Sequence, residues 1–325
     1  MSPFRTMLSF SSRRRAQRGR TLIELLIAMV LSLIIVGAVG VLYDVTSRTS
    51  RVSEQLGSAE ERGRLAMFFL SEPIAMAGYG NINSSNPRFQ AQTFMQPHLR
   101  GCTNGRFANP AAFDFTCVPT ALPGDALYVA YQAQSVTSNA PQGTAAMADC
   151  IGQLAVEVDG VPVVTNAFSI TLTGTNVPQL SCWGLGGGGT QGLVRNVEDF
   201  KVYFALDLDN YTRALGNVHT LRPSALMTAT QINLLPGATE FAASAGNPWN
   251  YVVSVHVCVQ LSTAEAGVTP DGTSVFTPCP QTVAEALDPS SIAPLTLADG
   301  IARRTYSQVF TLRSRGQALP GSGHL

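Results

Sequence analysis

The strongest pattern in the chain is an uninterrupted apolar run near its amino terminus. Between Leu25 and Tyr43 no charged residue occurs. As an α-helix, this segment would rise about 28 Å, close to the hydrocarbon thickness of a bilayer. The run therefore predicts a helix that can span a membrane, with the acidic residue Glu24 at its beginning.

Beyond the apolar run the pattern becomes amphipathic. Apolar residues recur at helical spacing with charged residues between them, at positions Val45, Val52, Leu56, Ala59, Ala66 and Leu70. Such a stripe predicts that the helix continues and packs one face along its length. Pro73 lacks a backbone N–H and is expected to end or kink the helix near Glu72. The whole helix would be on the order of 75 Å long.

After Gly78 the chain becomes rich in Gly, Pro, Asn, Ser and Thr, with short runs in which apolar and polar residues alternate. The expected strands are Ala126–Gln132, Leu154–Val158, Val161–Thr165, Phe168–Thr173, Phe200–Leu206, Val253–Leu261 and Ser307–Arg313. Asp159-Gly160 predicts a tight hairpin between two of them, and Ala225–Leu235 is expected to be a short helix. The alternation predicts half-buried antiparallel strands, hence an α+β fold.

Composition supports a sizeable core and separates the two ends of the chain. The 325 residues suffice for one large domain or two small ones, with 45% hydrophobic and 13% charged residues. The arginines Arg5, Arg13, Arg14, Arg15 and Arg18 precede residue 19, without any acid there. This basic segment is typical of a cytoplasmic flank that orients a membrane helix. The remaining chain is mildly acidic, which argues against binding of nucleic acid.

The cysteines indicate an oxidising compartment. All six follow the apolar run, at Cys102, Cys117, Cys150, Cys182, Cys258 and Cys279. None forms a CxxC pair, and no histidine accompanies them at the spacing of a zinc finger. An even number of cysteines beyond an export signal predicts three disulfides, whose pairing the spacing alone leaves open.

Several segments resemble chemical motifs without completing them. The glycine-rich stretch 184–192 lacks the lysine and hydroxyl residue of a phosphate-binding loop, so a loop between strands is expected. Asp207-Leu208-Asp209-Asn210 lacks the glycine and distal glutamate of a calcium loop and is expected to be a solvated turn. The four histidines are scattered, and no catalytic serine or cysteine setting is present. We expect neither an enzyme nor a cofactor or metal.

The junction between basic segment and apolar run, Arg18-Gly19-Arg20-Thr21-Leu22-Ile23-Glu24, resembles the type IV prepilin signal. In that family a leader peptidase cuts after the glycine and methylates the new amino terminus, and the fifth mature residue is a glutamate. The resemblance implies cleavage between Gly19 and Arg20, N-methylation of Arg20, and a role of Glu24 in assembly. The family most often has phenylalanine where this chain has Arg20.

Physical reasoning gives Glu24 a consistent role. A carboxylate within a spanning helix costs about 2.5–3.5 kcal/mol, so it requires a partner. The available cation is a terminal amine, either its own or that of a neighbouring subunit, and such a pair would fix the axial register between helices. The alternatives are an ordinary signal anchor with a snorkelling glutamate, or a signal peptide cleaved near Ala38-Val39-Gly40.

More distal segments resemble minor pilins of the PilW type. They are Glu61–Ala66, Met76–Gly80, Asp149–Gly152, Leu180–Cys182, Leu193–Phe200, Trp249–Val255 and Phe310–Arg313. The resemblance implies the type IV pilin fold, in which a long protruding N-terminal helix packs on an antiparallel sheet with disulfide-tied loops. The simplest disulfide pairing joins sequence neighbours, Cys102–Cys117, Cys150–Cys182 and Cys258–Cys279, and the resemblance favours the middle pair.

The resemblance also implies an organisation and a role. Residues 1–19 would be a leader, 20–43 the transmembrane and polymerisation half of the helix, 44–76 its amphipathic half, and 77–325 a periplasmic and later extracellular head. The expected function is that of a minor pilin in pilus assembly and in pilus-dependent motility or adhesion. Expected partners are the major pilin, other minor pilins, prepilin peptidase, the inner-membrane assembly machinery and a tip adhesin. The alternatives are a pseudopilin of type II secretion or a pilus-tip adhesin.

Overall fold

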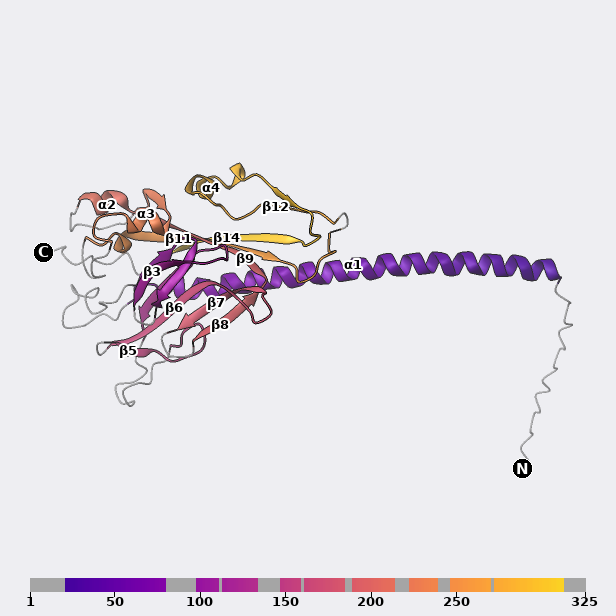
Figure 1. Ribbon diagram of the computed structural model, residues 1–325, viewed down its shortest axis with the longest axis horizontal. Helices are drawn as coiled ribbons and strands as arrows, with labels where there is room; N and C mark the ends of the chain where they lie inside the picture. Colours follow the sequence, from indigo (N-terminus) through magenta and orange to yellow (C-terminus); the bar gives the residue numbers. More distant parts are fainter. Residues whose placement is uncertain are drawn as a thin grey trace, which may run out of the picture. The chain divides into compact units, whose positions relative to one another are not determined.

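The computed structural model describes residues 21–79, 98–110, 113–133, 147–158, 161–184, 189–213, 222–238, 246–269 and 272–312 (Figure 1). The chain divides into two compact units, residues 1–51 and residues 52–325. The first unit contributes only the beginning of a long helix to the described residues. The second contains the rest of that helix and all the strands.

The long helix α1 comprises Leu22–Met76. It begins where the Thr21 carbonyl accepts hydrogen bonds from the backbone N–H groups of Glu24 (3.1 Å) and Leu25 (3.3 Å). The expected end near Glu72 is wrong, because the helix continues past Pro73 to Met76. Pro73 is buried beside Ile74, so packing offsets the hydrogen bond that proline cannot donate.

The end of α1 is marked by a glycine rather than by the proline. Gly78 has a φ of +73°, a left-handed conformation that glycine adopts without steric cost. Its N–H then donates to the carbonyl of Ala130 (2.9 Å), which ties the chain to a strand of the first sheet. The sequence signal for the helix end was therefore Gly78.

The amphipathic stripe predicted for the second part of α1 is confirmed from Val52 onward. Its buried residues are Ala59, Gly63, Ala66, Leu70, Pro73 and Ile74. Val45, the first member of the predicted stripe, is 55% exposed and does not belong to it. Gly63 occupies the position between Ala59 and Ala66, which hydrophobicity alone could not reveal because glycine has no side chain.

The first sheet is antiparallel and has the strand order β1-β4-β6-β7-β8, with β5 also paired to β6. Its strands are β1 (Leu99–Cys102), β4 (Ala126–Gln132), β5 (Val156–Val158), β6 (Val161–Leu172), β7 (Pro178–Gly184) and β8 (Thr190–Arg195). The prediction of β4 is confirmed at both ends. The hairpin is confirmed by the pairing of Val158 with Val161, while its turn residues lie outside the described part.

One strand prediction in this sheet is wrong. The segments Val161–Thr165 and Phe168–Thr173 were expected as separate strands, but β6 runs without a break from Val161 to Leu172. Asn166 and Ala167 continue the ladder, pairing with Gly184 and Trp183 of β7. Pairing on both sides thus sustains a strand through residues that are not themselves strong strand formers.

The second sheet is also antiparallel, with the order β10-β9-β11-β14. Its strands are β9 (Val197–Leu206), β10 (Ala225–Met227), β11 (Val252–Ser262) and β14 (Arg303–Thr311). The helix expected at Ala225–Leu235 is only partly present, since β10 precedes a short helix α3 (Ala229–Asn233). Thr228 starts this helix with a capping box to Gln231, so the chain before it stays extended.

Smaller elements complete the second unit. Two further pairs of strands are β2 (Gly105–Asn109) with β3 (Asp114–Pro119), and β12 (Ser274–Phe276) with β13 (Leu295–Leu297). Short helices are α2 (Leu208–Arg213) and α4 (Val283–Leu287), with single 3₁₀ turns at Pro248–Tyr251 and Pro289–Ser291. With α1 and the two larger sheets, they confirm the predicted α+β fold.

The three disulfides join sequence neighbours. The Cα–Cα distances are 5.5 Å for Cys102–Cys117, 6.3 Å for Cys150–Cys182 and 5.8 Å for Cys258–Cys279. This is the simplest of the pairings expected from the sequence. Each closes a loop of moderate length, which stabilises the folded state by about 3 kcal/mol in the chain-entropy view.

The outer face of β11 is more covered than the alternating pattern predicted. Gln260, on the side opposite the valines, is only 7% exposed. Cys258 ties a loop to this side through Cys279, and the loop is further fixed by Tyr203, whose hydroxyl donates to the Pro280 carbonyl (2.8 Å). The polar positions of the strand are therefore buried beneath a loop and not by a second apolar layer.

A buried carboxylate joins the two sheets. Asp125, at the start of β4, is 4% exposed and accepts hydrogen bonds from the backbone N–H groups of Asn104 (2.9 Å) and Val202 (2.8 Å). Its own N–H donates to the Phe200 carbonyl (2.7 Å) of β9. Burial raises the pKa of Asp125 above its usual range. These bonds fix the registration of β4 against β9.

Candidate functional site

The first part of α1 presents apolar side chains that nothing else in the described chain covers. Every residue from 22 to 46 is exposed, including Leu33 (74%) and Val36 (69%). An 18-residue window of this helix has a mean hydropathy of 3.0, and none of that window is buried. By length and composition the helix can cross a membrane. Its apolar surface calls for hydrocarbon or other apolar helices around it.

Glu24 lies in the first turn of this apolar segment. The first backbone N–H groups of a helix lack partners within it, and the helix dipole favours a negative charge there. Thr21 and Glu24 also have the spacing of a capping box. The start of the helix thus lowers the free-energy cost of placing the Glu24 carboxylate in an apolar environment, but it supplies no positively charged partner. Gly19 and Arg20 lie outside the described residues, so cleavage and methylation there stay predictions.

The second part of α1 is anchored to the second sheet at Gly63. A Cβ atom added at this glycine would overlap the ring of Tyr306 in β14. The ring therefore lies directly on the helix backbone, and burial raises the pKa of its phenol. Arg62 donates to the carbonyl of Arg195 (3.5 Å) at the end of β8, and burial lowers the pKa of the Arg62 guanidinium. Neither contact was visible in the sequence pattern.

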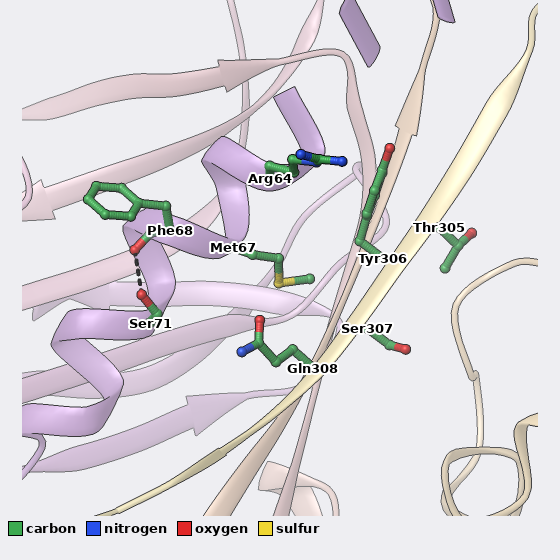
Figure 2. Close-up of a pocket in the computed structure, with 8 residues that line it drawn as sticks. All are labelled: Arg64, Met67, Phe68, Ser71, Thr305, Tyr306, Ser307 and Gln308. Atoms are coloured by element: carbon green, nitrogen blue, oxygen red, sulfur yellow. Dashed lines mark hydrogen bonds between the residues drawn. The ribbon is translucent and has the colours of Figure 1, made fainter. Parts of the chain in front are cut away.

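An open groove of about 650 Å³, which we call the α1–β14 groove, lies beside this contact. Figure 2 shows the side chains that line it. Its lining residues are Arg64, Met67, Phe68, Ser71, Thr305, Tyr306, Ser307 and Gln308. Phe68 is 66% exposed, and the Ser71 hydroxyl donates to its carbonyl (2.8 Å). Arg64 forms a salt bridge with Glu60 (2.7 Å). This lining offers a surface for contact, but it brings together no nucleophile and base.

Metal-binding chemistry finds no support in the described residues. Among them, no three His, Cys, Asp or Glu side chains gather closely enough to hold an ion. Asp207, which begins the calcium-like segment, accepts from the backbone N–H of Arg222 (2.8 Å) and precedes α2. The expected solvated turn is therefore a hydrogen-bonded helix start.

Comparison with known proteins places the amino terminus in a family. The family described as the prokaryotic N-terminal methylation motif matches residues 14–40. No curated protein matches the chain. Four solved chains match, among them the type IV-like pilin TTHA1219 from Thermus thermophilus, with 12% identity, a TM-score of 0.37, and coverage of 78% of this chain and 97% of that one.

The family match covers only the amino-terminal part of the chain. The methylation motif spans the junction between the basic segment and the apolar run. The long helix that follows, the antiparallel sheets and the three disulfides form the α+β arrangement expected of a pilin. Residues 14–40 therefore match the prokaryotic N-terminal methylation motif, and the described residues that follow have the α+β fold predicted from the sequence.

Proposed function

We propose that this chain is a minor pilin of the PilW type that takes part in assembling a type IV pilus. One observation carries the proposal: the methylation motif leads into a helix whose apolar side chains from Leu22 to Val45 are all exposed, with Glu24 in its first turn. Such a helix suits a subunit that is stored in the bilayer and then packs against equivalent helices in a fibre. The role is structural and not enzymatic.

The proposal assigns a task to each part of the chain. Prepilin peptidase removes residues 1–19 on the cytoplasmic side and methylates Arg20. Residues 20–43 anchor the subunit in the inner membrane and later polymerise, and residues 44–76 continue as the amphipathic half of the helix. Residues 77–325 form a head that stands first in the periplasm and then at the cell surface.

Glu24 sets the register of assembly in this proposal. Its carboxylate pairs with the amine of Arg20, either its own or that of the neighbouring subunit, because an unpaired charge in hydrocarbon is costly. The first subunits of a fibre must leave the bilayer before any fibre exists against which they can pack, which creates a free-energy barrier to initiation. A small set of minor pilins, matched by their heads, would lower this barrier once per fibre, so few copies are needed.

Processing is tested by mass spectrometry of the full-length protein from membranes. We expect an amino-terminal peptide that begins at a methylated Arg20. A start near Val41 would instead indicate a cleaved signal peptide and would contradict the pilin proposal.

The assembly role is tested with Glu24→Ala, using Ser32→Ala as the matched control. Ser32 lies in the same apolar segment, and its hydroxyl already bonds to the Met29 carbonyl (2.8 Å). We expect both variants at normal levels in the membrane. Glu24→Ala should fall about tenfold in sheared fibres, the factor that ~1.4 kcal/mol of lost pairing would give. Equal incorporation of both variants would contradict the pairing.

The gene neighbourhood separates the proposal from its alternatives. Pilus subunits beside the gene would support it, while a secretion ATPase and secretin with exported substrates would indicate a pseudopilin. Deletion of the gene should leave the major pilin in the membrane while surface pili and twitching fall sharply. Normal numbers of pili would argue for a tip adhesin that assembly does not require.

A further inference from the structure

A second cavity, of about 330 Å³, shares Phe68 with the α1–β14 groove. Helix α1 contributes Phe69, Glu72 and Pro73, the sheet contributes Tyr131 and Asn166, and the loop before β5 contributes residues 147–150. We call this cavity the Glu72–Asp149 pocket. All of it belongs to the second compact unit.

Asp149 is held in place with one carboxylate oxygen unused. Its Oδ1 accepts from the backbone N–H groups of Ile151 (3.0 Å) and Gln153 (2.8 Å), which fixes the side chain. The residue is only 9% exposed, and its Oδ2 has no hydrogen-bond partner among the described residues. A Cβ at Gly184 would overlap this oxygen, so the glycine allows the carboxylate to sit there. A buried carboxylate oxygen without a donor favours an occupant that supplies one.

Glu72 brings a second carboxylate to the same cavity. It is exposed on α1 and forms no salt bridge with any residue that the structure describes. Burial raises the pKa of the Tyr131 phenol, and the negative charges of Glu72 and Asp149 raise it further. Glu72, Asp149 and Tyr131 all line this cavity. The lining contains no lysine, arginine or histidine.

The remaining walls suit a cation on an aliphatic stem. The rings of Phe68, Phe69 and Tyr131 line the cavity together with Met147 and Pro73. Aromatic rings attract cations, and the attraction strengthens where water is excluded. Arginine and lysine side chains bury their methylene stems against such apolar surface.

We propose that the Glu72–Asp149 pocket receives a lysine or arginine side chain from a neighbouring pilin head. The partner's class rests on the proposed pilus function, whereas the cationic ligand rests on charge complementarity within the pocket. The competing occupant is a neutral hydroxyl compound. Its hydroxyl would donate to Asp149 Oδ2, which has no partner among the described residues.

Calorimetric titration of the full-length protein in detergent micelles tests the ligand class. The probes are n-butylammonium, n-butanol as its neutral counterpart, a methyl glycoside, and Ca²⁺ alone. We expect n-butylammonium to bind and its affinity to weaken as NaCl rises from about 50 mM to about 500 mM. Equal binding of n-butanol, or binding of the glycoside or of Ca²⁺ in place of the ammonium, would overturn the proposal.

Charge-neutral variants locate the binding. Glu72→Gln and Asp149→Asn should each weaken n-butylammonium about tenfold, the loss expected when a charged partner is removed. Asp149→Asn keeps an oxygen for the two backbone N–H groups of its loop, so the fold should persist. Glu61→Gln, an equally exposed position on α1 outside the pocket, is the matched control and should bind normally. Unchanged affinity in both pocket variants would overturn the assignment.

Photo-crosslinking in native membranes tests the partner. A crosslinking amino acid replaces Ala148, an exposed residue of the pocket lining, and Leu234, 81% exposed and outside the lining, serves as control. We expect the crosslinker at position 148, but not at position 234, to capture a pilin-type chain, with the crosslink beside a lysine or arginine of that chain. The crosslink yield should be severalfold lower in the Glu72→Gln variant. Capture beside no basic residue would refute the contact. If n-butylammonium binds but no pilin is captured, the claim that the partner is a pilin is refuted, whereas the claim that the pocket binds a cation still holds.

Discussion

The two parts of α1 form one continuous helix, but they differ in burial: the side chains of the first part are exposed, and one face of the second part is buried. Between Leu22 and Arg51 no side chain is buried, although most are apolar. Between Val52 and Met76 a stripe of small and apolar residues is buried against the sheets. The apolar side chains of the first part can be covered only by surroundings outside the described chain, whereas those of the second part are covered by the chain itself.

The difference shows that hydrophobicity and burial carry separate information. Leu33 and Leu70 are the same residue type in one helix, yet Leu33 is 74% exposed and Leu70 is fully buried. Gly63 has no side chain at all and is nevertheless a central contact of the second part. The four predictions below challenge this division, beginning with the largest expected effect.

Alkaline pH should unfold the second unit and spare the first part of α1. Burial raises the pKa of five tyrosines of the second unit: Tyr128, Tyr131, Tyr203, Tyr251 and Tyr306. Because the folded pKa exceeds the unfolded one, these phenols stabilise the fold fully below pH about 10. That stability is lost as pH rises through the folded values. In micelles, near-ultraviolet circular dichroism should vanish before the helical signal of the first part, and simultaneous loss would contradict the division.

Shortening a leucine should be costly only in the second part. Leu70→Ala should lower the free energy of unfolding of the head by about 2–5 kcal/mol, because it opens a cavity in a packed core. Leu33→Ala, the same change on the exposed part, should leave that free energy unchanged. Chemical denaturation of both full-length variants in micelles, followed by tryptophan fluorescence, gives the comparison. A comparable loss in Leu33→Ala would show that the first part also packs on the head.

A single methyl group should have opposite effects at two glycines of the helix. Gly63→Ala should destabilise the head by about 1–3 kcal/mol, since the new Cβ overlaps the Tyr306 ring. Gly57→Ala meets no atom within 4 Å and should stabilise the helix by about 0.5–1 kcal/mol. Thermal melts of the two variants decide this. Adding Tyr306→Ser should cost less in Gly63→Ala than in the wild type, because the clash is then relieved.

An exposed aromatic in the second part should behave like a surface residue. Phe68 is 66% exposed, so Phe68→Ala should change the unfolding free energy by no more than about 0.5 kcal/mol. Equilibrium denaturation beside Leu70→Ala provides the measurement. A loss above 2 kcal/mol would mean that position along α1, and not burial, determines its stability.

The elements that could be predicted are those whose signal lies in their own residues. The apolar part of α1 can be recognised without any packing partner, and the short apolar run of β4 predicted both ends of that strand. The resemblance to the prepilin signal likewise depends on residues close together, and the assembly role that it implies for Glu24 stays a prediction. The spacing of the cysteines left their pairing open, and the structure has the simplest choice, in which each disulfide joins sequence neighbours.

The features that could not be predicted are contacts between segments that lie far apart in the sequence. Arg100 lies in β1, which no alternating pattern marked, and is only 8% exposed. Its guanidinium carbon lies 5.9 Å from the ring centre of Phe115 and 5.6 Å from that of Trp249. Burial lowers its pKa to about 10, so it remains charged at neutral pH. The Glu72–Asp149 pocket is hidden for the same reason, since its two carboxylates come from remote parts of the chain.

The connection from β11 to β14 has a consequence for how this protein can evolve. These strands are direct neighbours, and the residues that follow and precede them meet where the N–H of Thr263 donates to the Ala302 carbonyl (2.9 Å). Residues 263–302 thus leave and re-enter the sheet at one point, carrying β12, α4 and β13. Replacing this excursion of about 40 residues by a tight turn would change the closure entropy by only about 2 kcal/mol. Lineages could therefore lengthen, shorten or exchange it, altering the subunit's outer contour while the sheet beneath persists.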